Sequence, residues 1–211
     1  MRPSVDKEML MKLYGADASP YARKVRMVIA ERGLSALVEE IYVSASQDPP
    51  ELIAANPLGK IPALVTDDGL TLFDSPVICA YLDAHPQGQG DRLRPHSGNE
   101  RWLVMRAEAL GDGLMDLGLA LITEKRKPEG EKSPTLTARQ RGQLMRALDR
   151  TPETLATLPQ AVTLGHIAIA AALGYLDYRH AELSWREGRG ELAVWHAEFA
   201  KRPSYIATMP A

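Results

Sequence analysis

The chain contains a single cysteine, Cys79, among its 211 residues. An internal disulfide is therefore impossible, and without a C-x-x-C pair the redox chemistry of paired thiols is excluded. Cys79 falls within a helical pattern of apolar residues. This setting is typical of a buried thiol that behaves as a small hydrophobic side chain.

Charge and hydropathy argue against two classes of partner. The formal net charge is only -2 and no basic stripe is present, so we expect no nucleic-acid partner. No apolar run reaches the about 18 residues that indicate a membrane span. The N-terminal stretch Met1–Glu8 lacks an apolar signal region. We therefore expect a soluble, cytoplasmic protein that does not bind membranes.

Several catalytic patterns are also missing. The five histidines show no i, i+4 or knuckle spacing, so we expect no metal site. The glycine pairs Gly88/Gly90 and Gly111/Gly113 do not complete a phosphate-binding fingerprint. The chain has no G-x-S-x-G nucleophile elbow either.

The hydrophobic content is sufficient for a sizeable core, at 45% of residues. Up to residue 85, patterning predicts the order β-α-β-α-β-β-α. The turn Asp67-Asp68-Gly69 makes the last two strands antiparallel, and the β-α-β opening implies a right-handed parallel crossover. The expected elements span 9–14, 20–32, 37–43, 48–55, 62–66, 70–73 and 75–84. Together they predict a small mixed sheet with helices on its faces.

Glycine and proline mark residues 86–98 as a linker. After the linker every pattern is helical, over 99–124, 135–158, from Thr163 onward, and over 191–201 before Pro203. We therefore expect an α/β domain at 9–85, a linker at 86–98 and an all-helical domain at 99–211. On the first long helix we expect one apolar stripe, formed by Trp102, Met105, Ala109, Leu110, Gly113, Leu117 and Leu121.

Two segments carry the strongest indication of function. Asn56–Leu64 leads from a turn into a strand that starts with proline, and Asp74-Ser75-Pro76 begins a helix with a carboxylate beside a hydroxyl. Helix starts of this kind bind anions. We interpret the two segments as a backbone edge and an anion-binding helix end that face one small, peptide-like ligand.

Five pieces of the chain resemble the glutathione transferase superfamily. They are Ser19–Arg26, Asn56–Leu64, Asp74–Ile78, Thr163–Tyr178, and the tail Asp177–His180 with Trp185–Arg189, which is similar to a bacterial branch. The resemblance spans nearly the whole chain. It implies a thioredoxin-like N-terminal domain, an all-helical C-terminal domain, glutathione as co-substrate, a homodimer, and conjugation chemistry of the kind used in detoxification.

One position departs from the family pattern. Many members carry Asp three residues after the Thr that caps the core helix of the second domain, and this chain has His166 there. A neutral imidazole accepts one hydrogen bond at most. We expect a modified helix cap and an intact fold.

The resemblance places Ser19 where several classes hold their catalytic residue. A free thiol has a pKa of about 8.5, and lowering it by two units requires about 2.7 kcal/mol. A hydroxyl donating to a charged acceptor contributes roughly 1.5–3 kcal/mol and a helix N-terminus about 0.3–1 kcal/mol, so no metal or general base is needed. The alternatives are that Ser19 only caps its helix, or that Tyr14 is the activating hydroxyl.

The remaining contacts to glutathione also follow from the resemblance. A cis proline is implied after Ile61, whose backbone N–H and C=O would bind the cysteinyl unit. Ser75 would bind the γ-glutamyl carboxylate, Asp74 its ammonium group, and Lys60 the glycyl carboxylate. The structural alternatives are a plain strand-starting proline, a helix cap and an exposed lysine.

We expect the second substrate to contact Trp102, Met105 and Arg106, although the Trp and Met also fit a helix core. The predicted function is conjugation of glutathione to small electrophiles, or glutathione-dependent peroxide reduction. The alternatives are a non-catalytic member that binds glutathione or a protein partner, and a disulfide reductase. The last would need a thiol in place of Ser19.

Overall fold

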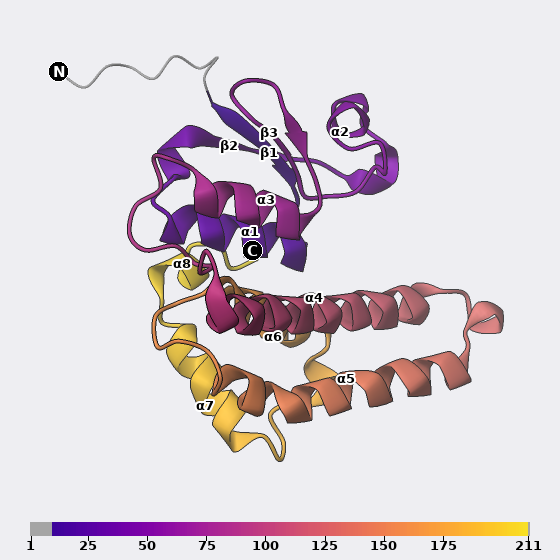
Figure 1. Ribbon diagram of the computed structural model, residues 1–211. Helices are drawn as coiled ribbons and strands as arrows, with labels where there is room; N and C mark the ends of the chain where they lie inside the picture. Colours follow the sequence, from indigo (N-terminus) through magenta and orange to yellow (C-terminus); the bar gives the residue numbers. More distant parts are fainter. Residues whose placement is uncertain (1–9, 211) are drawn as a thin grey trace. The chain divides into compact units, whose positions relative to one another are not determined.

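The computed structural model describes residues 10–210 and is shown in Figure 1. The chain divides into two compact units. The first runs to Arg92 and includes the C-terminal segment from Ala207, and the second is Leu93–Ile206. Met9, the predicted first residue of the opening strand, and the stretch Met1–Glu8 lie outside the described residues.

The first unit contains a four-stranded mixed sheet in the order β2-β1-β3-β4. β1 pairs in parallel with β2, whereas the β1–β3 and β3–β4 pairs are antiparallel. This arrangement confirms the predicted β-α-β-α-β-β-α order. The elements are β1 Met11–Gly15, α1 Pro20–Glu31, η2 Ser35–Leu37, β2 Val38–Tyr42, η3 Ala45–Gln47, α2 Pro50–Ala55, β3 Ala63–Val65, β4 Thr71–Leu72 and α3 Ser75–Ala84.

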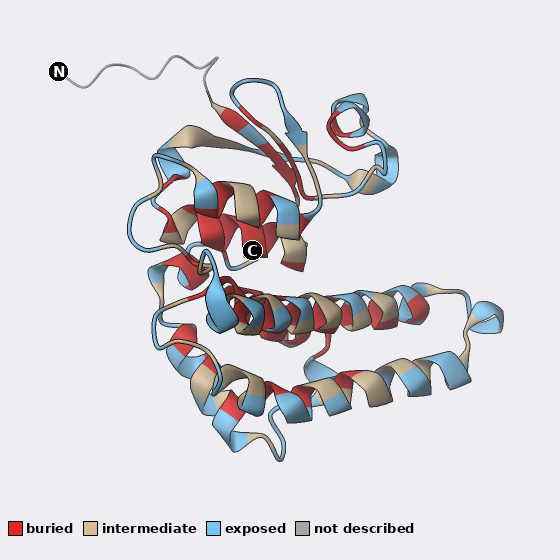
Figure 2. Ribbon diagram, in the orientation of Figure 1, coloured by how far each residue is buried: buried red, intermediate tan, exposed pale blue. Residues whose placement is uncertain are grey.

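The two faces of the sheet pack against different helices. Tyr14 forms a buried cluster with Leu52 and Ala55 of α2 and with Ala63, its partner across the strands. Leu13 points to the opposite face, because successive strand residues alternate. Helices α1 and α3 pack against each other along that side of the sheet (Figure 1). Within this unit, Figure 2 shows buried positions on β1, β3, α1 and α3.

The second unit is entirely helical. It contains α4 Gly98–Arg126, η4 Glu129–Glu131, α5 Pro134–Leu155, α6 Leu164–Arg179, η5 Ala181–Leu183, α7 Gly190–Phe199 and α8 Pro203–Ile206. Pro203, predicted only to end a helix, is the first residue of α8. Proline is suited to that position because its fixed φ matches a helix start and it has no N–H that would need a partner. None of the helices within residues 10–210 is long and apolar enough to traverse a bilayer.

The predicted apolar stripe of α4 is confirmed at Leu121, which is buried, but it is wrong as a whole. Trp102 is 64% exposed, and the buried face is formed instead by Val104, Ala107, Gly111, Leu114 and Gly118. Helix α6 packs against this face, and small residues allow the close approach. A Cβ atom at Gly111 would lie 2.5 Å from the carbonyl carbon of Ala168. The predicted stripe follows a different face of the helix, because Gly111 and Gly118 become core residues only through the close approach of α6.

Helix α6 begins with a reciprocal capping box. Thr163 Oγ1 accepts a hydrogen bond from the backbone N–H of His166, and His166 Nδ1 accepts one from the N–H of Thr163 at 3.2 Å. The cap is therefore modified but intact, as expected. Burial, together with the charge of Arg202, lowers the pKa of His166 to about 4. A neutral imidazole is the form that can accept this bond.

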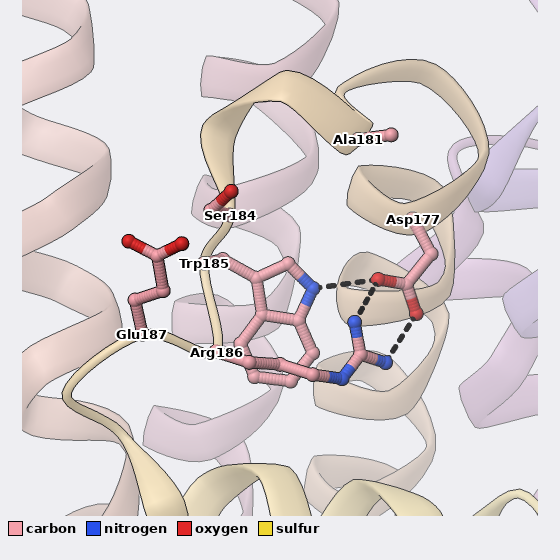
Figure 3. Close-up of a pocket in the computed structure, with 6 residues that line it drawn as sticks. All are labelled: Asp177, Ala181, Ser184, Trp185, Arg186 and Glu187. Atoms are coloured by element: carbon pink, nitrogen blue, oxygen red, sulfur yellow. Dashed lines mark hydrogen bonds and ion pairs between the residues drawn. The ribbon is translucent and has the colours of Figure 1, made fainter.

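The tail segment that resembles the bacterial branch is fixed to the end of α6. The carboxylate of Asp177 accepts the indole N–H of Trp185 at 2.7 Å and both terminal nitrogens of Arg186 at 2.5 and 2.7 Å. The guanidinium also lies over the Trp185 ring, 4.3 Å from its centroid (Figure 3). These residues line a hollow of about 290 Å³. Because Asp177 and Arg186 in its lining are paired with each other, we assign it a structural role.

Candidate ligand-binding site

The sheet topology brings three chain segments together at one end of the strands. Tyr14, next to the end of β1, pairs with Ala63 at the start of β3, and Leu64 pairs antiparallel with Leu72 at the end of β4. The end of β1, the start of β3 and the end of β4 therefore lie at the same end of the sheet. The segments that contain Ser19, Ile61 and Ser75 adjoin these three points.

Ser19 is the N-cap residue of α1. Its Oγ accepts the backbone N–H of Ala22 at 3.2 Å. Within residues 10–210 the Ser19 side chain makes no other hydrogen bond, so its hydroxyl hydrogen is available for donation. The first turn of α1 contains no acidic residue, and the nearby Asp17 is paired with Arg26 at 3.2 Å. The positive helix end at Ser19 is thus not neutralised from within the helix.

Ile61 presents an unpaired peptide edge. The Ile61–Pro62 peptide bond is cis, as the resemblance implies. Across the described part of the chain, neither the N–H nor the C=O of Ile61 takes part in a hydrogen bond. Most buried or half-buried backbone groups are paired. A half-buried edge with both groups unpaired is suited to a peptide ligand.

Helix α3 begins one residue earlier than predicted, because the sequence pattern made Ser75 the cap and Pro76 the first helical residue. Asp74 is the N-cap, Ser75 is the first helical residue and Pro76 follows. The exposed Asp74 side chain makes no capping bond. Ser75 is only 2% exposed, and its hydroxyl has no hydrogen-bond partner within residues 10–210. The Phe73–Asp74 peptide bond is also cis, which the sequence did not predict.

Comparison with known proteins identifies the family. The sequence pattern of "Glutathione S-transferase, N-terminal domain" matches residues 13–90. The "Uncharacterized GST-like protein YibF" of Escherichia coli is 34% identical over 95% of this chain and 98% of its own length. The chain belongs to the glutathione S-transferase family.

Solved structures of family members are similar over nearly the same length. A glutathione transferase family member from Pseudomonas fluorescens, with bound glutathione, is 36% identical with a TM-score of 0.88, over 95% of this chain and 99% of that one. A glutathione S-transferase from Methylobacillus flagellatus, also with glutathione bound, is 36% identical with a TM-score of 0.86 and covers 95% and 100%.

The sequence prediction for this glutathione transferase fold missed one residue of the site, Asn56. It is 2% exposed, its Nδ2 donates to the carbonyl of Lys60 at 2.8 Å, and its Oδ1 accepts from the N–H of Leu58 at 3.0 Å. The signal was present, because asparagine before proline commonly bonds its own turn. The Lys60 side chain is exposed and makes no ion pair within residues 10–210.

The location of Tyr14 argues against it as the activating hydroxyl. Its side chain lies in the cluster packed under α2, on the face of the sheet opposite to α1. Burial, assisted by the carboxylates of Glu51 and Glu39, raises the pKa of its phenol. A phenol with a raised pKa is a weaker hydrogen-bond donor to a thiolate.

The three residues predicted for a second substrate all lie on α4. Trp102 and Arg106 are exposed and Met105 is half-buried, so the Trp is not a core residue. Arg106 Nη2 donates to Thr157 Oγ1 at 3.3 Å. Their role toward a second substrate stays a prediction.

Within residues 10–210 no group of three or more metal-ligating side chains is close enough to hold an ion.

Proposed function

We propose that this chain is a glutathione transferase in which Ser19 stabilises the thiolate of glutathione. The observation that carries the proposal is the uncommitted hydroxyl hydrogen of Ser19 at the N-terminus of α1. Because Oγ accepts from Ala22 N–H, its hydrogen is left to donate to a ligand bound at this end of the sheet, which Ile61 also adjoins.

The energetics are sufficient for this role. Lowering a thiol pKa by two units takes about 2.7 kcal/mol. One hydroxyl donated to a charged acceptor supplies roughly 1.5–3 kcal/mol, and the helix end adds about 0.3–1 kcal/mol. At pH 7 most of the bound glutathione would then be thiolate.

The other groups hold the tripeptide in place. The N–H and C=O of Ile61 bind its cysteinyl backbone. The Ser75 hydroxyl and the first N–H groups of α3 bind the γ-glutamyl carboxylate. Asp74 binds the γ-glutamyl ammonium group and Lys60 the glycyl carboxylate. None of these side chains has a competing ion pair among the described residues.

In the reaction, a lone pair of the thiolate sulfur forms a new bond to an electrophilic carbon of the second substrate. With an aryl halide, the halide leaves with the bonding electrons, and the thiol proton has already passed to solvent. With a hydroperoxide, sulfur attacks one oxygen and the O–O bond breaks, which releases the alcohol (or water) and leaves glutathione sulfenic acid. The thiol of a second glutathione then attacks that sulfur, which forms glutathione disulfide and releases the remaining oxygen as water. We expect the second substrate to lie against Trp102, Met105 and Arg106.

The test has two steps. Isothermal titration with glutathione should show binding at millimolar concentration or below, and an aryl halide should then be conjugated at a rate that depends on the protein. Absence of binding would overturn the proposal. Binding without turnover across a panel of electrophiles and peroxides would instead support the non-catalytic alternative. We also expect a homodimer, which light scattering would test.

The disulfide reductase alternative has a separate test. That reaction needs a sulfur nucleophile at the N-terminus of α1, where this chain has an oxygen. We expect Ser19→Cys to gain reduction of glutathione mixed disulfides that the natural chain lacks. Gain of this activity would support the assignment of the site. Equal reductase activity in both proteins would contradict it.

A further inference from the structure

We infer that Asn56 is a positioning residue that aims the backbone N–H of Ile61 at the ligand; this inference rests on the proposed binding of glutathione. All four polar groups of Asn56 are used inside the protein. Its N–H donates to Leu52 O at 2.7 Å and its C=O accepts from Gly59 N at 2.9 Å. Its side chain bonds Leu58 N at 3.0 Å and Lys60 O at 2.8 Å.

These four bonds connect the end of α2 to the approach to β3. The backbone bonds anchor Asn56 to α2 and close the turn to Gly59, whose φ of +62° is a left-handed conformation suited to glycine. The side chain then spans the turn from within. Because Asn56 is buried, its amide has no water to compete for these bonds.

The bond to Lys60 fixes the direction of the next N–H. Lys60 C=O and Ile61 N–H belong to the same planar peptide group, and this bond is not among the cis bonds of the described chain. In a trans peptide the C=O and N–H point in opposite directions. Holding the carbonyl inward on Asn56 Nδ2 therefore points the Ile61 N–H outward, where it has no partner within residues 10–210.

Asn56 thus acts on the ligand through Ile61 without touching it. An outward N–H that cannot rotate away binds an acceptor at little entropic cost. Without this anchor the Lys60–Ile61 peptide group could rotate, and its N–H would form a hydrogen bond to water. Asn56 should consequently affect the affinity for glutathione and leave the chemistry at the sulfur, which depends on Ser19, unchanged.

The sharpest variant is Asn56→Asp. It keeps the acceptor for Leu58 N–H, but it replaces the donor to Lys60 by an oxygen that repels the carbonyl. We expect the Kd for glutathione to rise about tenfold, the value of one neutral hydrogen bond. The turnover at saturating glutathione and the pKa of the bound thiol should remain those of the natural chain. Asn99→Asp, the same substitution at an exposed position of α4, should change neither quantity.

The outcomes separate this inference from the proposed function. If the natural chain does not bind glutathione, the proposed function fails. If the natural chain binds and Asn56→Asp binds equally well, the positioning role fails while the function stands. A lower turnover at saturation, with unchanged affinity, would also contradict it, because Asn56 would then act on the reacting sulfur.

A measurement on the natural chain covers the case in which the variant does not fold. Hydrogen exchange followed by NMR should show slow exchange of the Asn56 side-chain amide protons in the presence and absence of ligand. The Ile61 amide should exchange rapidly without glutathione and become protected when it is added. Rapid exchange at Asn56, or an Ile61 amide that glutathione does not protect, would overturn the inference.

Discussion

At the scale of the residue, Ser19 combines two roles that use different parts of one hydroxyl group. Its oxygen accepts from Ala22 N–H and caps α1, while its hydrogen is available to a ligand. A cap is a property of the fold and a donor is a property of the site. Substitution removes both together, so a test of function needs a control for the loss of the cap.

We predict that Ser19→Ala keeps glutathione binding but loses most turnover. Removing a hydroxyl that donates to a charged acceptor should raise the pKa of the bound thiol by about one to two units. The lost cap should lower the free energy of unfolding by about 1 kcal/mol. Steady-state kinetics and chemical denaturation measure the two effects separately.

Ser133→Ala is the matched control for this variant. Ser133 caps α5 in the second unit by accepting from Leu136 N–H at 3.3 Å. It should show a similar loss of stability with unchanged turnover. If both variants lose turnover equally, the effect comes from helix capping and Ser19 has no catalytic role.

At the scale of the element, the start of α6 makes stability depend on pH. The pKa of His166 is lowered to about 4, whereas the imidazole of an unfolded chain titrates near 6.5. The unfolded chain therefore takes up the proton first. The neutral imidazole contributes fully to the free energy of unfolding above pH 6.5. This contribution, up to about 3 kcal/mol, is lost as the pH falls from 6.5 to about 4.

We predict that His166→Asp removes this loss. A carboxylate can accept the same Thr163 N–H, and it stays ionised over the range in which the imidazole is protonated. Denaturation curves between pH 7 and 4 should show a steeper decline for the natural chain than for the variant. Parallel curves would show that His166 does not titrate as the structure requires.

The contact between α4 and α6 gives a second prediction at this scale. A Cβ at Gly111 would meet the Ala168 backbone at 2.5 Å, whereas a Cβ at Gly113, on the same helix, would meet nothing within 4 Å. We expect Gly111→Ala to destabilise by roughly 1–3 kcal/mol. Gly113→Ala should be neutral or stabilise by up to about 1 kcal/mol. Thermal unfolding compares the two, and equal effects would contradict the packing described.

Element order was largely predictable from the sequence, because caps and turns act locally. Ser19-Pro20 and Asp68-Gly69 determine where chain segments begin or reverse. The buried face of α4 was not predictable in this way, because Gly111 and Gly118 become core residues only when α6 lies against them. Small residues give no hydrophobic signal of their own.

The candidate site was predictable only in part for a related reason. Ser19 and Ser75 stand at helix starts, which can be recognised locally. The role of Asn56 depends on a side chain that crosses its own turn to Lys60. The N–H and C=O of Ile61 are unpaired only because no neighbouring segment of the fold offers them a hydrogen-bond partner. Asparagine before proline predicts a bond within the turn, but no sequence pattern shows that the Asn56 amide reaches Lys60 or that the Ile61 peptide groups stay unpaired.

At the scale of the whole molecule, the glutathione contacts proposed for Ser19, Lys60, Ile61, Asp74 and Ser75 all belong to the first compact unit. A ligand bound by the folded state alone stabilises it by mass action, by about 2.7 kcal/mol at 100 times its Kd. We predict this gain on adding glutathione, measured by denaturation, with a smaller gain in Asn56→Asp at the same concentration. No gain in the natural chain would mean that glutathione does not bind the folded protein.

The most direct test of the account is the titration of the glutathione thiol on the natural chain, followed through the ultraviolet absorbance of the thiolate. With a saturated site, the account predicts a thiol pKa about two units below the value of about 8.5 for a free thiol. A bound thiol that titrates as it does in buffer would contradict the claim that Ser19 and the N-terminus of α1 stabilise the thiolate.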